Sequence, residues 1–250
     1  MAQIETDYLV IGGGAAGLAF TDTLIAESGA DVTIVDRHGR PGGHWNDAYP
    51  FVTLHQPSAF YGVNSLPLGS GRKATTGLNQ GLYELASGAE ILHYFERVMA
   101  DRLLPSGRVR YHPMCNVVAA GDGRAEFESL VSGARTQVRV RRKVVDATHF
   151  SPNVPSTHRP RFAVSPQVRM IAPNGLPQLW STWYAGQAAA PPSRFVVLGA
   201  GKTAMDAVIW LLGTGAEPAR VQWVMPRDSW LVNRLTTQPA SEFFHESIGN

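Results

Sequence analysis

The sequence contains a single cysteine, Cys115, among its 250 residues. One cysteine cannot form a disulfide within the chain, so the composition excludes an internal Cys-x-x-Cys redox pair and suits a reducing compartment. Cys115 lies in the apolar stretch 114–118. This setting favours a buried structural thiol over a lone nucleophile.

Long apolar runs are lacking as well. No stretch approaches the length of a membrane span. The first residues also lack the basic segment that precedes the apolar core of a secretory signal, because Glu5 and Asp7 come first. We therefore expect a cytoplasmic protein.

The chain has no charge excess of one sign. Its 22 basic and 20 acidic residues give a formal net charge of +2, which indicates neither nucleic acid nor an anionic membrane as a partner. The densest basic run, Arg139, Arg141, Arg142 and Lys143, flanks a strand-like segment and is interpreted as the solvated face of a hairpin. We expect a globular protein of one or two domains that acts on a small-molecule substrate.

A glycine-rich motif follows the first apolar segment. Residues 7–11 predict a buried parallel strand, and residues 12–17 directly after it fit the spacing G-x-G-x-x-G. Residues 18–25 have a helical period, and the β-branched segment 31–35 predicts a second strand that ends on Asp36. Strand, glycines, helix, strand and acid together predict a dinucleotide-binding βαβ unit.

Each residue of this motif has a physical role. Gly12 permits a tight turn, Gly14 lets the backbone approach a pyrophosphate, and Gly17 lets the helix pack closely on the sheet. Ala16 belongs to the same loop, where free N–H groups at the helix N-terminus favour a phosphate. Asp36 stands where a carboxylate accepts from ribose hydroxyls. Both NAD and FAD use this architecture, so the unit alone leaves that choice open.

The next segment distinguishes the two cofactors by resemblance. Residues 37–45 contain Gly-Gly-His-Trp, and Tyr-Pro follows at 49–50. This pattern resembles the flavin-dependent monooxygenase superfamily, in which a Gly-Gly-x-Trp element follows the first βαβ unit and lies along FAD. The resemblance implies FAD at the first site, with contacts from Arg37, Gly43, His44 and Trp45.

Two further segments extend the resemblance. Residues 54–58 occupy the place of the family's polar loop under the isoalloxazine ring, where Gln56 is the nearest amide to the usual asparagine and His55 precedes it. These two residues are the candidates for chemistry at the flavin. Residues 144–149 resemble the family's strand that ends in Ala-Thr-Gly, which implies Thr148 at the cofactor. His149 replaces the glycine, either as a turn substitution or as a proton-transfer group.

A second nucleotide signal follows a proline-rich stretch. Eight of the 17 prolines lie between residues 151 and 193, which discourages regular helix and indicates a connection between domains. Residues 194–198 and 221–225 predict two more strands, with an apolar helix over 205–212 between them. The loop before that helix has the form G-x-G-x-x-A, an accepted variant of the fingerprint; its candidate binding residues are Gly199, Gly201, Lys202, Thr203 and Ala204.

The residue after the last predicted strand bears on the choice of nucleotide. Arg227 stands where an NAD-specific site would have an acid, and an arginine there pairs with a 2′-phosphate or stacks on adenine. Lys202 adds positive charge, Asp228 adds negative charge, and Arg227 as a plain surface residue is the alternative. We interpret the site as one for NADPH.

A third family element, Phe-x-Gly-x-x-x-His-x-x-x-aromatic, is degenerate here. Gly175 and Trp183 match it, but Pro173 and Leu179 stand in place of the phenylalanine and histidine. The family's later segment, which returns to the FAD domain with a Gly-Asp contact, has no counterpart. We therefore expect an N-terminal portion of a longer protein, or a chain completed by another chain, including a homo-oligomer.

The sequence thus predicts an α/β protein with two Rossmann-like units. Residues 1–150 form the FAD-binding domain, 151–193 the connection, and 194–250 a partial NAD(P)H-binding domain. The predicted function is that of an FAD-binding, NADPH-dependent, monooxygenase-like oxidoreductase without a metal. The alternative is a non-catalytic nucleotide-binding module.

Overall fold

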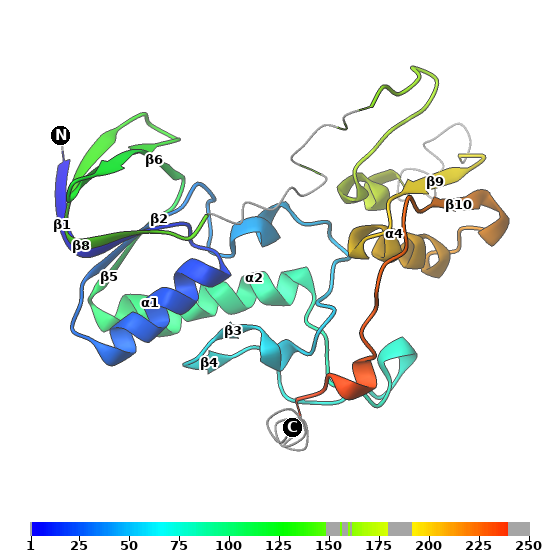
Figure 1. Cartoon of the computed structure of the whole chain (residues 1–250), viewed down its shortest axis with the longest axis horizontal. Helices are drawn as coiled ribbons and strands as arrows, with labels where there is room; N and C mark the ends of the chain where they lie inside the picture. The colour runs from blue at the N-terminus through cyan, green and yellow to red at the C-terminus, as the bar shows by residue number, and fades with distance from the viewer. Residues whose placement is uncertain (1, 149–155, 157–159, 161, 180–191, 240–250) are drawn as a thin grey trace. The chain divides into compact units, whose positions relative to one another are not determined.

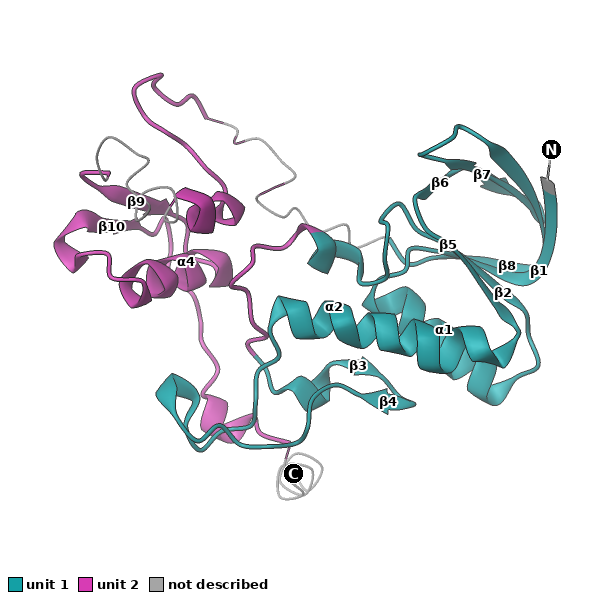
Figure 2. Ribbon diagram, turned by 180° about the vertical axis from the view of Figure 1, so that it is seen from behind, with its two compact units in different colours: residues 1–46, 56–152 teal, residues 47–55, 153–250 magenta. Residues whose placement is uncertain are grey.

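The computed structural model describes residues 2–148, 156, 160, 162–179 and 192–239. The chain divides into two compact units (Figure 2). Unit 1 comprises Met1–Asn46 and Gln56–Pro152, and unit 2 comprises Asp47–His55 and Asn153–Asn250. The short segment Asp47–His55 therefore belongs to the unit that holds the second glycine-rich loop.

Unit 1 is built on a six-stranded sheet of order β5-β2-β1-β8-β7-β6. The strands are β1 (Ala2–Ile11), β2 (Val32–Val35), β5 (Val109–His112), β6 (Cys115–Gly121), β7 (Arg124–Ser129) and β8 (Arg135–Asp146). Strands β5, β2, β1 and β8 run parallel, whereas β7 is antiparallel to both β8 and β6. The parallel part confirms the predicted α/β fold class.

The two faces of this sheet are covered differently. Helices α1 (Ala15–Glu27) and α2 (Gly88–Arg97) lie on one side of the parallel strands, and the hairpin of β6 and β7, which continues the sheet beyond β8, lies on the other (Figure 1). Leu9 and Val10 on β1 face opposite sides of the sheet, and both are fully buried. Both faces of the sheet are therefore covered at β1. On the hairpin side, Leu9 and Val35 pack against Cys115 and Phe127.

Helix α2 illustrates why local sequence fixes these elements. The Ser87 hydroxyl accepts from the N–H of Glu90, whose carboxylate accepts from the N–H of Ser87 at 2.7 Å, so a capping box starts the helix. A π-helical turn, Val98–Leu103, continues it and contacts α1. The apolar residues that recur with helical period along this segment are all buried; these are Ile91, Leu92, Phe95, Val98, Met99 and Leu103.

Shorter elements complete the structure. Strands β3 (Gly62–Val63) and β4 (Leu66–Pro67) form a small antiparallel pair. Single 3₁₀ turns occur at Gly43–Asp47, Ser58–Phe60, Gly77–Asn79, Leu104–Ser106, Pro173–Gly175, Pro218–Arg220 and Arg234–Thr236.

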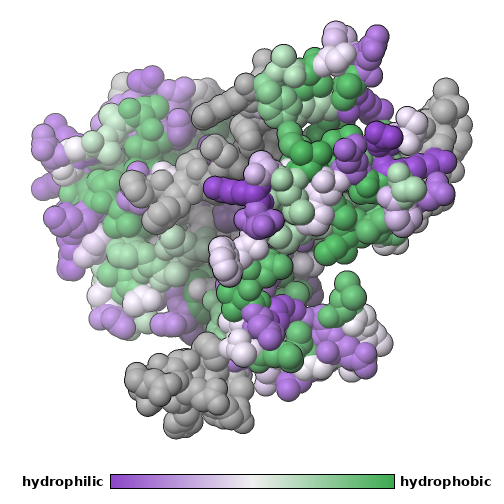
Figure 3. All heavy atoms as spheres, turned by 45° about the vertical axis from the view of Figure 1, so that its right-hand side comes forward, coloured by the Kyte–Doolittle hydropathy of each residue, from purple (hydrophilic) through white to green (hydrophobic). Residues whose placement is uncertain are grey.

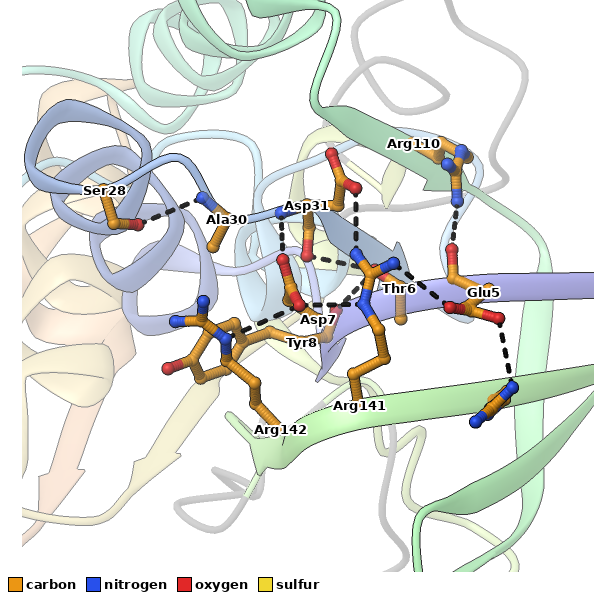
Figure 4. Close-up of polar contacts among 11 residues, drawn as sticks. Glu5, Thr6, Asp7, Tyr8, Ser28, Ala30, Asp31, Arg110, Arg141 and Arg142 are labelled. Carbon is orange, nitrogen blue, oxygen red and sulfur yellow. Dashed lines mark hydrogen bonds and ion pairs between the residues drawn. The ribbon is translucent and has the colours of Figure 1, made fainter.

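The basic run of β8 pairs with acids on neighbouring strands and loops (Figure 4). The Arg141 guanidinium lies 2.9 Å from an oxygen of Asp7 and 3.1 Å from oxygens of both Glu5 and Asp31. The hydrogen bond from Arg141 holds the pKa of the Asp7 carboxyl below its ordinary value. Arg142 also pairs with Asp7, at 3.5 Å. The run is thus a solvated, largely neutralised face, as its sequence predicts.

Unit 2 contains a small parallel βαβ arrangement. Strands β9 (Phe195–Leu198) and β10 (Val221–Val224) pair in parallel, and α4 (Lys202–Gly213) connects them. The core comprises Leu176, Phe195, Ala207, Leu211 and Ala216. Phe51 from the short segment stacks on Trp210, with ring centroids 5.0 Å apart. The predicted second strand–loop–helix–strand unit is therefore present.

The outer side of the β9–β10 pair is apolar. Val196, Leu198 and Val224 are all exposed there, and hydrophobic residues lie among hydrophilic ones on the face drawn in Figure 3. Within the described ranges, no helix is both long and apolar enough to cross a bilayer.

Removal of the Tyr94 hydroxyl tests how much its hydrogen bonds contribute to the stability of unit 1. Tyr94 is buried on α2; its hydroxyl donates to the carbonyl of Leu66 at 2.6 Å and accepts from the N–H of Val63 at 2.7 Å. Tyr94→Phe leaves both backbone groups unpaired, so we expect a loss of about 1–3 kcal/mol in the free energy of unfolding. Urea-induced unfolding measures it.

Tyr8→Phe is the matched control. The Tyr8 ring packs on Phe20 at 5.9 Å, and its hydroxyl makes no hydrogen bond to any described residue. This substitution should change stability little. Equal losses in the two variants would show that the ring environment matters and the hydrogen bonds of Tyr94 do not.

Candidate functional site

The first glycine-rich loop joins β1 to α1. Strand β1 ends at Ile11 and α1 begins at Ala15, with Gly14 as the N-cap residue. Gly12 has a φ of +103° and donates its N–H to the carbonyl of Val35 at 2.8 Å. A side chain would be strained at this φ, so the turn depends on glycine at position 12.

Gly17 sets how closely α1 approaches the loop. A Cβ atom at this position would overlap the carbonyl oxygen of Gly12 and crowd the side chain of Val10 at 3.2 Å. Only glycine avoids that overlap without moving the helix. This is the packing role that the fingerprint assigns to its third glycine.

Asp36 lies directly after β2 and points at the loop. Its carboxylate is only 4% exposed, and Oδ2 accepts a close hydrogen bond from the N–H of Gly13. Oδ1 accepts from the His38 backbone N–H at 2.7 Å and contacts His38 Nδ1 at 3.0 Å. Asp36 therefore lies beside the glycine loop. Its link to His38 was not expected.

The geometry of this loop fits a dinucleotide. Within the described residues, no side chain caps the N-terminus of α1, and its first turn carries no acid, so its free N–H groups suit a phosphate. Asp36 Oδ2 accepts one hydrogen bond there, which leaves a lone pair for a ribose hydroxyl. Ala16 is exposed on the first turn of the helix.

The Gly-Gly-x-Trp segment packs on the same loop. The N–H of Gly42 donates to the carbonyl of Gly13 at 2.8 Å. A Cβ atom on Gly43 would lie 2.9 Å from the Cα of Gly14, so the two backbones touch. Arg37 is exposed beside Asp36.

Trp45 is an anchor for this segment. Its ring is buried, Nε1 donates to the hydroxyl of Tyr61 at 2.7 Å, and Tyr61 packs edge-on against Phe95 of α2. Burial raises the pKa of the Tyr61 hydroxyl. The exposed ring of His44 stacks on Trp45 with centroids 5.3 Å apart. Trp45 thus holds the segment on unit 1 and presents His44 to solvent.

The end of β8 lies beside the first glycine-rich loop. The N–H of Ala147 donates to the carbonyl of Ile11 at 2.9 Å, and a Cβ atom on Gly12 would lie 3.0 Å from Cγ2 of Thr148. The Thr148 hydroxyl bonds to Asp146 at 2.5 Å. Thr148 therefore lies beside the first glycine, while His149 lies outside the described residues.

The second loop repeats this arrangement in unit 2. Gly199 has a φ of +131°, and its N–H donates to the carbonyl of Val224 at 3.0 Å. Gly201 is the N-cap residue of α4, and Ala204 is buried in the first turn. Trp223 donates its Nε1 proton to the carbonyl of Gly199 at 2.7 Å. This bond fixes the loop against β10.

A carboxylate one turn into α4 organises the start of that helix. Asp206 forms a close ion pair with Lys202 and accepts from the hydroxyl of Tyr49 at 2.7 Å. Thr203 donates to the same hydroxyl, and burial followed by Asp206 raises the pKa of Tyr49. Lys202 therefore brings compensated rather than free positive charge. The i,i+4 spacing of Lys202 and Asp206 on a helix could have predicted their ion pair from the sequence. Nothing in the sequence predicts the contact of Tyr49 with α4.

The remaining candidates are less constrained. Arg227 is exposed after β10. His55 is exposed at the end of the short segment of unit 2, whereas Gln56 is half-buried at the start of the next segment of unit 1. Neither His55 nor Gln56 has a hydrogen-bond partner among the described side chains or backbone. Trp183 lies outside the described residues.

Two other kinds of site receive no support. Cys115 is buried, and desolvation raises the pKa of its thiol, which disfavours the reactive thiolate. No group of three or more His, Cys, Asp or Glu side chains able to hold a metal ion occurs in the part of the chain that is described. The candidate sites are the two glycine loops, one in each unit, each with its own neighbouring residues.

Comparisons with known proteins agree with this geometry. Residues 10–65 match the family model described as an NAD(P)-binding Rossmann-like domain. The flavin-containing monooxygenase from Stenotrophomonas maltophilia is 16% identical with a TM-score of 0.54, over 92% of this chain and 60% of that one. The chain has the fold of a flavoprotein oxidoreductase. The bacillithiol disulfide reductase from Bacillus cereus shares it, at 15% identity and a TM-score of 0.58, over 98% of this chain and 64% of that one.

Two mycobacterial proteins are much more similar in sequence. Uncharacterized protein Rv2000 of Mycobacterium tuberculosis is 51% identical over 249 residues, which are 98% of this chain and 44% of that protein. Uncharacterized protein Mb2023 of Mycobacterium bovis gives the same values. The chain thus spans less than half the length of these curated relatives. The expected resemblance to the N-terminal part of flavin-dependent monooxygenases is borne out at the level of the fold.

Gly17→Ala tests the close approach of α1 to the loop. Replacing glycine by alanine inside a helix normally stabilises it by up to about 1 kcal/mol. At Gly17 the overlap with the Gly12 carbonyl should reverse the sign and cost about 1–3 kcal/mol. Gly213→Ala, in α4 with no atom within 4 Å of the added Cβ, is the control and should stabilise or be neutral. A stabilised Gly17→Ala protein, measured by urea unfolding, contradicts the proposed packing.

Proposed function

We propose that this chain is the nucleotide-binding part of an NADPH-dependent, monooxygenase-like flavin oxidoreductase, with FAD at the first glycine loop and NADPH at the second. The observation that carries the assignment of FAD is the contact of the Gly-Gly-x-Trp segment with the first loop, where Gly42 bonds to Gly13. An NAD site needs the loop and the acid, but it does not need this second layer of glycine backbone, held in place by Trp45.

Several residues would hold FAD. The N–H groups at the start of α1 would bind the pyrophosphate, which the missing Cβ atom of Gly14 allows to come close. Asp36 would accept from the adenosine ribose. Gly43 and Thr148 border the loop on its other sides, and His44 follows Gly43 and stacks on Trp45. Bound FAD supplies the redox chemistry, because it accepts a hydride from a reduced nicotinamide and passes electrons to oxygen or another acceptor.

At the second loop the protein would hold NADPH mostly by its backbone. Lys202 is paired with Asp206, so the N–H groups of Gly201 to Thr203 would carry the pyrophosphate. Arg227, exposed beyond β10, would supply the uncompensated positive charge that a 2′-phosphate requires. We further propose a cytoplasmic protein with a small-molecule substrate, completed by a C-terminal part or by a second copy, with His55 and Gln56 toward the flavin.

The bound cofactor is the direct test of this proposal. The purified chain should be yellow and should release FAD on denaturation, identified by mass spectrometry. Asp36→Ala should lower the FAD content, because the ribose and the Gly13 N–H both lose their acceptor. Release of a nicotinamide nucleotide alone would refute the FAD assignment. NADPH-dependent bleaching of the yellow colour would argue against a non-catalytic binding module.

Arg227→Ala tests the choice of nicotinamide nucleotide. A charge-assisted contact to a phosphate contributes about 1.5–3 kcal/mol, so NADPH binding should weaken about tenfold to a hundredfold. NADH binding should stay nearly unchanged. Calorimetric titration with both nucleotides measures the difference.

Arg220→Ala is the control for that experiment. Arg220 is also exposed and precedes β10, but it pairs with Glu217 at 2.9 Å. It should affect neither nucleotide. Equal losses of NADPH and NADH in Arg227→Ala would mean that Arg227 stacks on adenine or supports the fold, and no loss would make it a surface residue.

A further inference from the structure

Tyr111 lies next to the first glycine loop without having been singled out by any sequence motif. It stands on β5, in register with Ile34 of β2, close to the carboxyl ends of these parallel strands. A Cβ atom placed on Gly13 would lie 3.4 Å from Cε2 of Tyr111 and 2.7 Å from Oδ2 of Asp36. The tyrosine ring and the Asp36 carboxylate therefore flank the same point of the loop.

The hydroxyl of Tyr111 belongs to a small set of buried side-chain atoms without a partner among the described residues, together with atoms of Thr33, His112 and Asn174. It is enclosed by protein atoms and has no hydrogen-bond partner among the described residues. Three other tyrosines have paired hydroxyls: Tyr49 bonds to Asp206, Tyr61 to Trp45, and Tyr94 to Leu66 and Val63. Buried polar groups are almost always paired, so an unpaired hydroxyl beside a binding loop calls for a partner from outside the chain.

We propose that Tyr111 is a ligand-binding residue whose hydroxyl donates to the same adenosine ribose that Asp36 accepts from. This rests on the proposed FAD site and adds a contact to it. A ribose hydroxyl is both a donor and an acceptor. An ionised carboxylate can only accept, so the ribose proton goes to Asp36 and the ribose oxygen accepts the proton of Tyr111.

The electrostatic setting keeps Tyr111 a donor. Burial, and then the charge of Asp36, raise the pKa of its hydroxyl, which therefore stays protonated at neutral pH. Part of the ring is exposed although the hydroxyl is not. The proposal thus requires the side chains around the hydroxyl to shift locally when the ribose binds.

Tyr111→Phe in the 250-residue chain separates binding from folding. The chain is freed of flavin and then titrated with FAD. FAD binding should weaken about five- to tenfold, as expected for one lost hydrogen bond. Binding of FMN, which has no adenosine half, should not change. The Tm of the flavin-free variant should stay the same or rise, because removing an unpaired buried hydroxyl relieves its desolvation cost.

Tyr94→Phe is the matched control, because its hydroxyl is paired within the chain. It should lower Tm by about 2–8 °C. If Tyr111→Phe lowers Tm in the same way, or leaves FAD affinity unchanged, or weakens FAD and FMN equally, the proposed ribose contact is wrong.

An ADP titration keeps this test distinct from that of the proposed function. If the wild-type chain binds ADP but not FAD, the proposed flavin site fails. A weaker ADP affinity in Tyr111→Phe would then still support the ribose contact, and an equal affinity would overturn it. Failure of the wild-type chain to bind either compound overturns both proposals.

Discussion

Unit 1 depends on one close approach, that of Gly17 in α1 to the carbonyl of Gly12. Because no side chain separates them, the helix can begin immediately after β1, and its N-terminus points into the turn. The other contacts follow from this placement. Asp36 at the end of β2 reaches the N–H of Gly13, and the carbonyl of Gly13 is left to accept from Gly42. A helix displaced outward by one methyl group would disturb both bonds.

The two glycine loops share the features that favour a bound phosphate. Neither helix N-terminus is capped by a side chain within the described residues, so in each the helix dipole and the free N–H groups provide the positive potential. The nearest carboxylates are occupied, Asp36 by backbone and His38, and Asp206 by Lys202 and Tyr49. Lys202 compensates the charge of Asp206, whereas Asp36 accepts from backbone N–H groups and keeps a lone pair for a ligand.

Sequence reasoning succeeded where the structure is local. The order of strand, glycines, helix and strand was readable in both units, because each step follows from neighbouring residues. The position of Asp36 was readable as well, since parallel strands end at a common edge. The apolar residues of α2 also recur with helical period, although nothing in that period marks the π-helical turn at Val98–Leu103.

Contacts between distant segments were not readable. Tyr49 meets Asp206 across 157 positions of sequence, and no periodicity or composition marks a single long-range hydrogen bond. The unpaired hydroxyl of Tyr111 could not be predicted from the sequence either, because a tyrosine on a strand normally indicates only a β-forming residue. Whether such a hydroxyl is paired depends on packing between β5 and the glycine loop.

The segment Asp47–His55 has a consequence for how this architecture can be inherited. It contributes Phe51 and Tyr49 to unit 2, although it lies in the sequence between the two segments of unit 1. Unit 2 is therefore not a contiguous stretch of gene. A recombination event that replaced only the later stretch would exchange α4 and its strands while keeping the old aromatic partners. The two segments of unit 2 must accordingly be expected to diverge together, and exchanging this unit for another requires two matched replacements.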